Sequence, residues 1–258
     1  MSDPTPTPPG RWADLRLRVL SALVLIAVGA LEIWLGGPPF ALFAVVVTGV
    51  MIWELACLTA PWVEVSPVRM GLYAGLTLVL VLAIDHPLAL PLLVLPGAVF
   101  VMTERRDRHL AGAYSLLIML AGYALVGLRG GAGPSAILWV IAVVVASDVL
   151  GYFAGRMLGG PKFWPRISPK KTWSGTVAGW IGAALVAAGF VWFGGADWRL
   201  VPISVVVAFA GQMGDILESW VKRRAGVKDS SRLIPGHGGL LDRFDALIGA
   251  VATVKLVA

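Results

Sequence analysis

Residues 19–35 read VLSALVLIAVGALEIWL, an apolar run in which Glu32 is the single charged residue. A helix needs about 20 mostly apolar residues to cross the hydrocarbon layer of a membrane, and this run with its flanking residues is long enough. It is too long for the core of a signal peptide, and the GGPPFA that follows at 36–41 lacks a small-residue cleavage pattern. The run therefore predicts a retained membrane-spanning helix.

Apolar runs of this kind recur along the whole chain. Of its 258 residues, 58% are hydrophobic and only 14% are charged, with a mean hydropathy of +0.82. A soluble domain is nearer half apolar and a quarter charged. The candidate spans lie at 17–36, 39–60, 68–84, 87–103, 109–128, 134–155, 175–194, 200–218 and 240–257. We expect an all-α, polytopic integral membrane protein with about nine transmembrane helices.

The basic residues indicate how these spans are oriented. With the N-terminus in the cytoplasm, 18 of the 21 Lys and Arg residues fall inside, and only Arg129, Arg199 and Lys255 fall outside. Cytoplasmic loops of membrane proteins carry such an excess of positive charge. The net charge of +6 belongs to loops between spans, so we expect contacts with membrane lipids and phosphates rather than nucleic acid. The expected location is the inner (cytoplasmic) membrane, with the N-terminus inside.

Three isolated residues of the first two spans predict structural roles. Cys57 is the only cysteine, which excludes an intramolecular disulfide and a cysteine metal cluster. It lies in an apolar run, so we expect an inert buried thiol. Glu32 and Glu54 lie within the same two spans, and we expect them to pair with polar groups or to lie near the membrane surface.

Two cytoplasmic loops, 155–175 and 219–239, are richer in polar residues than connectors need to be. Each carries five Lys or Arg residues among Gly, Pro, Ser and Trp. Four carboxylates flank them: Asp148, Asp215, Asp242 and Asp245. A charge at the bilayer centre costs about 2.5–3.5 kcal/mol, so such groups indicate function. Mg²⁺ prefers carboxylate and phosphate oxygens, and we therefore expect a metal-dependent, phosphate-handling site at the cytoplasmic surface.

A more specific pattern runs from Ser219 to Asp245. It reads Ser-x-Val-Lys-Arg, then after four residues Lys-Asp-x-Ser, and after two more Ile-Pro-x-His-Gly-Gly-Leu-x-Asp-Arg-Phe-Asp. This pattern resembles the signature of the phosphatidate cytidylyltransferase (CDP-diacylglycerol synthase) family at every specified position. Two further pieces, 147–175 and 211–223, look like the same family. Ser174 departs from it, since the resemblance leads us to expect an acidic residue there.

The resemblance implies a reaction and its partners. CTP and phosphatidate would give CDP-diacylglycerol and pyrophosphate in phospholipid biosynthesis, with Mg²⁺ as cofactor and room for a second metal ion. A homodimer is also what the family suggests. Two alternatives stay open at this point: a CTP-dependent lipid (polyprenol) kinase, and a membrane transporter for anionic substrates. The gathering of charges at the cytoplasmic ends of the spans, away from the membrane centre, disfavours the transporter.

The same resemblance, together with the charge pattern, assigns roles to particular residues. The expected metal ligands are Asp215, Asp242 and Asp245, with Asp148 as a further ligand. The catalytic set adds Lys228 and also His237, which would orient or protonate a phosphate oxygen. The expected substrate-binding residues are Ser168, Lys170, Lys171, Thr172, Ser219, Lys222, Arg223, Asp229, Gly238, Gly239 and Arg243.

These assignments divide the chain into three parts. Residues 1–16 form an N-terminal cytoplasmic segment, expected to be disordered because it opens with the Pro- and Thr-rich MSDPTPTPPG. Residues 17–130 form the N-terminal transmembrane helices. Residues 131–258 form a C-terminal catalytic transmembrane region, with cytoplasmic loops at 156–174 and 219–239.

Overall fold

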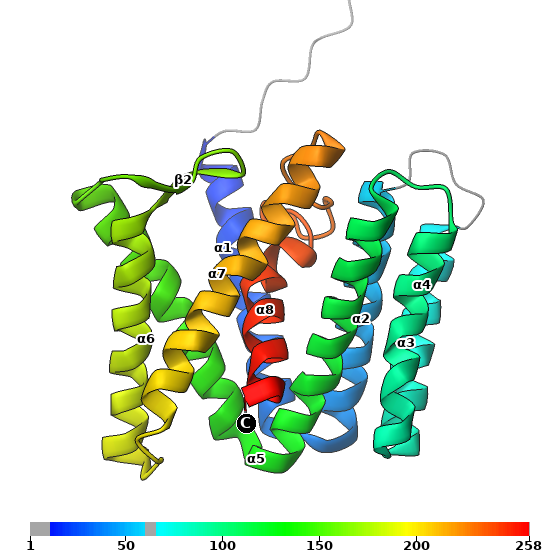
Figure 1. The fold of residues 1–258 in the computed structure, drawn as a ribbon, viewed down its shortest axis with the longest axis horizontal. Helices are drawn as coiled ribbons and strands as arrows, with labels where there is room; N and C mark the ends of the chain where they lie inside the picture. Colours follow the sequence, from blue (N-terminus) through cyan, green and yellow to red (C-terminus); the bar gives the residue numbers. More distant parts are fainter. Residues whose placement is uncertain (1–10, 60–65, 258) are drawn as a thin grey trace, which may run out of the picture.

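The computed structural model describes residues 11–59 and 66–257, most of which are helical (Figure 1). The helices are α1 (Arg11–Leu35), α2 (Gly37–Thr59), α3 (Pro67–Ile84), the 3-10 helix η1 (Pro87–Val94), α4 (Leu95–Met102), α5 (Arg108–Met157), α6 (Trp173–Gly194), α7 (Leu200–Ala225) and α8 (Leu241–Val257). They stand side by side in a bundle whose connections gather at its two ends (Figure 1). The helical fold class is as predicted.

The helices coincide closely with the predicted apolar runs. Six of them in the described residues (α1, α2, α3, α5, α6 and α7) are long and apolar enough to cross a membrane. The 50-residue α5 contains two of the predicted runs, which meet at a kink where Gly133 adopts a φ of 75° next to Pro134. The pair η1 and α4 is shorter and apolar. The number of nine membrane crossings stays a prediction.

The boundaries of the predicted parts differ from the helix boundaries. Helix α1 begins at Arg11, so residues 11–16 of the predicted N-terminal segment are helical, while residues 1–10 lie outside the described residues. Helix α5 runs through the predicted boundary at 130/131 and kinks three residues later. The two halves of the chain are therefore joined at a kink between two helical segments of α5.

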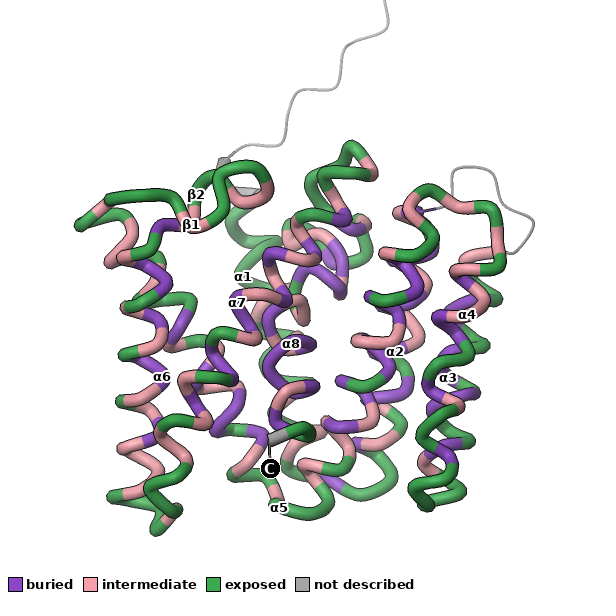
Figure 2. Tube along the Cα trace, in the orientation of Figure 1, coloured by how far each residue is buried: buried purple, intermediate pink, exposed green. Residues whose placement is uncertain are grey.

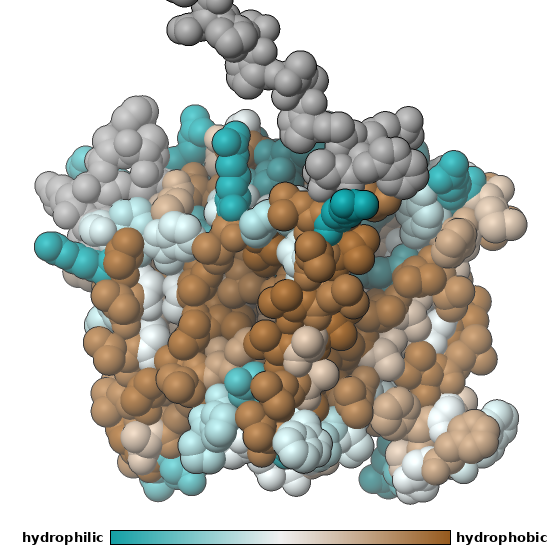
Figure 3. Space-filling view, turned by 180° about the vertical axis from the view of Figure 1, so that it is seen from behind, coloured by the Kyte–Doolittle hydropathy of each residue, from teal (hydrophilic) through white to brown (hydrophobic). Residues whose placement is uncertain are grey.

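The outside of the bundle is apolar. On the face shown in Figure 3 a broad hydrophobic band crosses its middle, and hydrophilic residues lie at both ends. In the most apolar 18-residue window of α1 no residue is buried, and Phe193 at the end of α6 is 93% exposed. Exposed apolar surface of this extent needs lipid around it, so the helices form a multi-pass membrane protein. The prediction of a buried Cys57 is wrong: this residue is exposed on α2.

One small sheet interrupts the helices. Strands β1 (Lys162–Trp164) and β2 (Ser168–Thr172) pair antiparallel, in the loop predicted between the sixth and seventh runs. The ring of Phe163 packs edge-on against that of Trp173 with centroids 4.7 Å apart, and Thr172 Oγ1 accepts a hydrogen bond from Gly175 N at the start of α6. The hairpin is thereby fixed to the helix that follows it.

Helix α8 lies in the middle of the bundle, and much of it is buried (Figure 2). It packs closely on α7 because glycines line their contact. A Cβ on Gly214 would lie 2.4 Å from Asp245 O, and one on Gly249 would lie 2.2 Å from Ala210 O. Small residues let membrane helices approach in this way. The close approach brings Asp215 of α7 next to Asp245 of α8.

Candidate active site

A cavity of about 710 Å³ opens near the hairpin end of the bundle, lined by residues of α5, α6, α7, α8 and the hairpin. Eight of the predicted site residues line it: Asp148, Lys170, Lys171, Thr172, Asp215, Asp242, Arg243 and Asp245. Ten further residues, none of them a predicted site residue, line it too: Ser147, Gly151, Tyr152, Gly155, Arg156, Lys162, Pro169, Gly175, Thr176 and Gln212. Segments nearly a hundred residues apart in the chain thus share one site.

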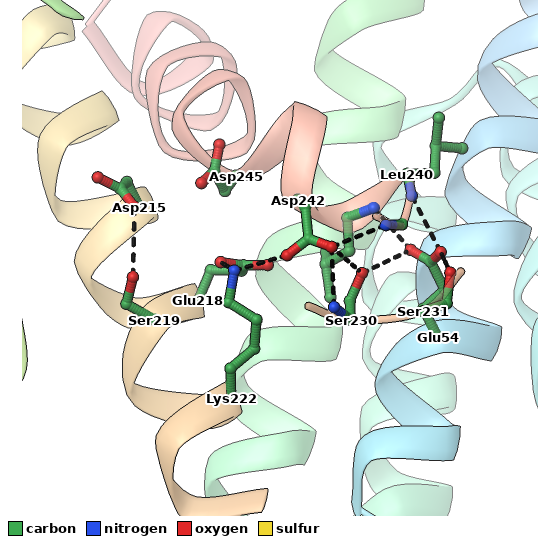
Figure 4. Close-up of polar contacts among 12 residues, drawn as sticks. Glu54, Asp215, Glu218, Ser219, Lys222, Ser230, Ser231, Leu240, Asp242 and Asp245 are labelled. Carbon is green, nitrogen blue, oxygen red and sulfur yellow. Dashed lines mark hydrogen bonds and ion pairs between the residues drawn. The ribbon is translucent and has the colours of Figure 1, made fainter. Parts of the chain in front are cut away.

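Carboxylates from two helices meet beside this cavity, which Asp215 and Asp245 line and the buried Glu218 does not. Asp215, Glu218 and Asp245 each offer one oxygen, and these oxygens lie within 4.8 Å of one another. Figure 4 shows Asp215 and Asp245 on facing helices, with Glu218 below them. Glu218 is a residue that the sequence reasoning missed. Its position three residues after Asp215 and four before Lys222, on the same face of the helix, is the signal that would have found it.

The hairpin places a cation against these carboxylates. Lys171 Nζ lies 2.5 Å from Asp215 Oδ2 and donates to the backbone oxygen of Gln212 at 3.3 Å. Lys171 is held there because the neighbouring Thr172 caps α6. Lys170, Arg156 and Arg243 are further cations of the same lining. Five Lys and Arg residues in all border the cavity, enough to face several phosphate charges.

Asp242 is held by donors on both of its oxygens. Oδ1 forms an ion pair with Lys222 Nζ at 2.6 Å. Oδ2 accepts from Ser230 N, Ser230 Oγ and Gly239 N, each at 2.8 Å. Lys222 also pairs with Glu218, so it connects the Asp242 side of the network to the three-carboxylate group (Figure 4). In this arrangement Asp242 organises the loop before α8 while its side chain borders the cavity.

The other predicted residues are not among those that line the cavity in the described part of the chain. They are Ser168, Ser219, Lys222, Arg223, Lys228, Asp229, His237, Gly238 and Gly239. His237 instead faces α1, where its Nδ1 lies 3.0 Å from Ser21 Oγ, and Ser21 Oγ donates to Pro235 O at 2.9 Å. Ser219 Oγ lies 3.4 Å from Asp215 Oδ1. Their roles in binding or catalysis stay predictions.

Comparison with known sequences decides the family. The sequence model described as "Cytidylyltransferase family" matches residues 16–258. The chain belongs to this family. A phosphatidate cytidylyltransferase of Brucella abortus is 35% identical to this chain over 264 residues. The alignment covers 95% of this chain and 93% of the Brucella protein. One from Staphylococcus haemolyticus is 28% identical, covering 94% and 98%, and one from Staphylococcus aureus is 29% identical with the same coverage.

The match to the cytidylyltransferase family extends beyond the pattern at 219–245 to the N-terminal helices, where the sequence shows apolar runs without a family motif. The atypical Ser174 lies at the base of the hairpin. Its Oγ donates to Gly159 O at 2.5 Å and lies 3.0 Å from Thr172 Oγ1. A hydroxyl at this position therefore holds the hairpin, and Ser174 is not a lining residue of the cavity.

Proposed function

We propose that this enzyme of the cytidylyltransferase family is a phosphatidate cytidylyltransferase, which converts CTP and phosphatidate to CDP-diacylglycerol and pyrophosphate. The observation that carries the proposal is a cavity in which carboxylates and five cations come together at one end of an apolar bundle. A nucleotide triphosphate and an anionic lipid headgroup need such neutralisation before they can approach each other. The apolar belt beside the cavity suits the acyl chains of a lipid.

The carboxylate group fits Mg²⁺. Hard oxygen donors from one or two carboxylates, completed by substrate phosphates, are what this ion takes, and the oxygens of Asp215, Glu218 and Asp245 converge within 4.8 Å. We propose that these three residues hold it, with Asp148 at the edge of the same cavity and Asp242 bordering it. When bound, the ion would offset the charge of the triphosphate.

The main task of the protein in this reaction is to position the two substrates. A phosphate oxygen of the lipid attacks the α-phosphorus of CTP in line, the bond to the bridging oxygen of the β-phosphate breaks, and pyrophosphate leaves with the electron pair. Lys170, Lys171 and Arg243 border the cavity and would hold the phosphates of both substrates. Charge stabilisation and orientation are then the main contributions of the enzyme.

We further propose that the cavity faces the cytoplasm at the inner membrane. CTP is a cytoplasmic nucleotide, and the end of the bundle that carries the cavity also carries the basic loops at 155–175 and 219–239 (Figure 1). The excess of positive charge on cytoplasmic loops supports this orientation.

Labelled CTP tests the proposed reaction. With purified protein, phosphatidate and Mg²⁺ in detergent, label at the α-phosphorus should enter the lipid, and label at the γ-phosphorus should appear in pyrophosphate. A lipid kinase would instead move the γ label to the lipid and leave the α label in CDP. Transfer of the γ label to phosphatidate or to a polyprenol would contradict the proposal. Absence of lipid label with either acceptor would also contradict it.

A further inference from the structure

A buried carboxylate of the second helix is bound to the loop that precedes α8. Glu54 has no exposed surface, and it lies nearly two hundred residues before its partners. Oε1 accepts from Ser231 Oγ at 2.5 Å and from Leu240 N at 2.9 Å. Oε2 accepts from Leu241 N at 2.6 Å. Figure 4 shows these contacts at the end of α8, beside Asp242.

The two backbone partners of Glu54 are N–H groups that a helix leaves without internal partners. The first N–H groups of an α-helix have no acceptor in the helix and carry a partial positive charge. Leu240 and Leu241 lie at the start of α8, so the carboxylate of α2 caps this helix from outside. Hydrogen bonds to a charged acceptor are stronger than those to a neutral one. The cap therefore fixes where α8 begins.

The cap is directly coupled to Asp242. Ser230 Oγ lies 3.4 Å from Glu54 Oε2 and 2.8 Å from Asp242 Oδ2. Gly239 N, immediately before Leu240, donates to the same Asp242 oxygen. A Cβ on Gly239 would lie only 2.0 Å from Ser230 Oγ and 2.4 Å from Glu54 Oε1, so no side chain fits at this position. Displacement of the cap would move Asp242 in the first turn of α8 and also Asp245, which lies one helical turn further along.

We propose that Glu54 is a positioning residue of the reaction: it sets the start of α8 so that Asp245 meets Asp215 and Glu218 at the cavity. This inference rests on the proposed function for its catalytic consequence. Its structural part, the anchoring of the loop and of the first turn of α8, stands independently. The N-terminal half of the chain would thus supply a residue on which the geometry of the C-terminal site depends.

The Glu54→Gln variant is the sharpest test, because glutamine keeps the size of the side chain. Each oxygen of Glu54 accepts a hydrogen bond from a backbone N–H group. In either orientation of the glutamine amide, its NH₂ group would face one of these N–H groups, so two donors would meet and one hydrogen bond would be lost. In protein without metal or substrate, we expect hydrogen exchange of the backbone amides at 240–241 to speed up about tenfold or more. Exchange in the hairpin β1–β2 should not change.

The same variant should lose turnover in the labelled-CTP assay. Misplacement of reacting groups by about 1 Å costs on the order of a hundredfold in rate, so we expect kcat to fall by about that factor while KM for CTP changes much less. Ser231→Ala removes one donor without introducing an opposing one, and its effects should have the same direction and be smaller. Glu32→Gln is the matched control in another membrane helix. Glu32 Oε2 has no hydrogen-bond partner among the described residues, so exchange at 240–241 should stay as in the parent.

Each outcome decides a separate point. Unchanged exchange at 240–241 in Glu54→Gln would overturn the inference. Faster exchange with an unchanged kcat would overturn the positioning role. If Glu54→Gln does not accumulate as folded protein, Ser231→Ala decides by the same two measurements. If the parent protein has no activity with CTP and phosphatidate, the proposed function fails, while the exchange data still decide whether Glu54 anchors α8.

Discussion

Lys171 Nζ of the hairpin lies 2.5 Å from Asp215 Oδ2 of α7 and ties the hairpin to that helix. The pair lies at the cavity, with about a quarter of the lysine side chain and 30% of the aspartate side chain exposed. A cation so placed offsets repulsion among Asp215, Asp245 and Asp148 before substrates bind. Lys171 also lines the cavity in which the triphosphate would bind.

Replacement of Lys171 by methionine should therefore reduce activity strongly. The variant keeps the length of the side chain and removes its charge, and loss of one charge stabiliser at a reacting phosphate costs about two to three orders of magnitude in kcat. The control is Arg166→Met, an exposed cation of the same hairpin that is not among the lining residues. A Lys171→Met enzyme as active as Arg166→Met would contradict the role of this lysine.

Asp215→Asn and Asp242→Asn should separate catalysis from stability. Asp215 is partly exposed and pairs with one lysine, so its variant should lose about two to three orders of magnitude in kcat and keep nearly the parent Tm. Asp242 is 9% exposed and holds Lys222, Ser230 and Gly239.

Loss of one partner of a buried ion pair costs about 3–5 kcal/mol, so Asp242→Asn should lower Tm as well as activity. Thermal unfolding and CTP turnover of both variants check this, with the exposed Asp197→Asn as control. Equal Tm values for the variants at 215 and 242 would show that Asp242 does not hold the loop.

The orientation in the membrane can be tested with single cysteines in a Cys57→Ser background. The side chain of Arg199 is 90% exposed and lies in the connection between α6 and α7. The exposed Arg166 lies in the hairpin, at the opposite end of the bundle. An impermeant thiol reagent added to intact cells should label Arg199→Cys and spare Arg166→Cys until the cells are opened. The reverse pattern would invert the proposed topology. Arg129 is a poor labelling site, because its Nε donates to Ile33 O at 2.7 Å.

An ion pair between Asp107 and Arg224 predicts a pH-dependent contribution to stability. Arg224 Nε donates to Asp107 Oδ2 at 2.7 Å, just before α5 begins. This hydrogen bond lowers the pKa of Asp107 below its ordinary value of 3.8. A carboxyl group with a lowered pKa stabilises the fold above its unfolded pKa, and this stabilisation is lost as the pH falls through the folded pKa.

Asp107→Asn should therefore lower Tm by at most a few degrees at neutral pH, since the pair is largely at the surface. The difference from the parent should shrink below about pH 4, where the parent carboxyl becomes protonated. Thermal unfolding from pH 7 to pH 3 measures it. A difference that does not change with pH would mean that the charge of Asp107 contributes nothing.

The sequence by itself determined the fold class and the kind of chemistry. Runs such as 19–35 are long and apolar enough for a membrane helix, in which every backbone group finds its partner within the run. Carboxylates beside such runs, at 148, 215, 242 and 245, mark a site because charges are costly there. The pattern from Ser219 to Asp245 indicated the family, and the comparison confirmed it.

Only the tertiary structure decided which of these residues share the site. Spacing along one helix placed Asp215 and Lys222 on one face, but the approach of α7 to α8 through Gly214 and Gly249 brought Asp245 to Asp215. The part played by Glu54 was not visible in the sequence, since its partners lie nearly two hundred residues away. A buried carboxylate is accommodated only where donors converge on it, and the chain brings those donors together only when it is folded.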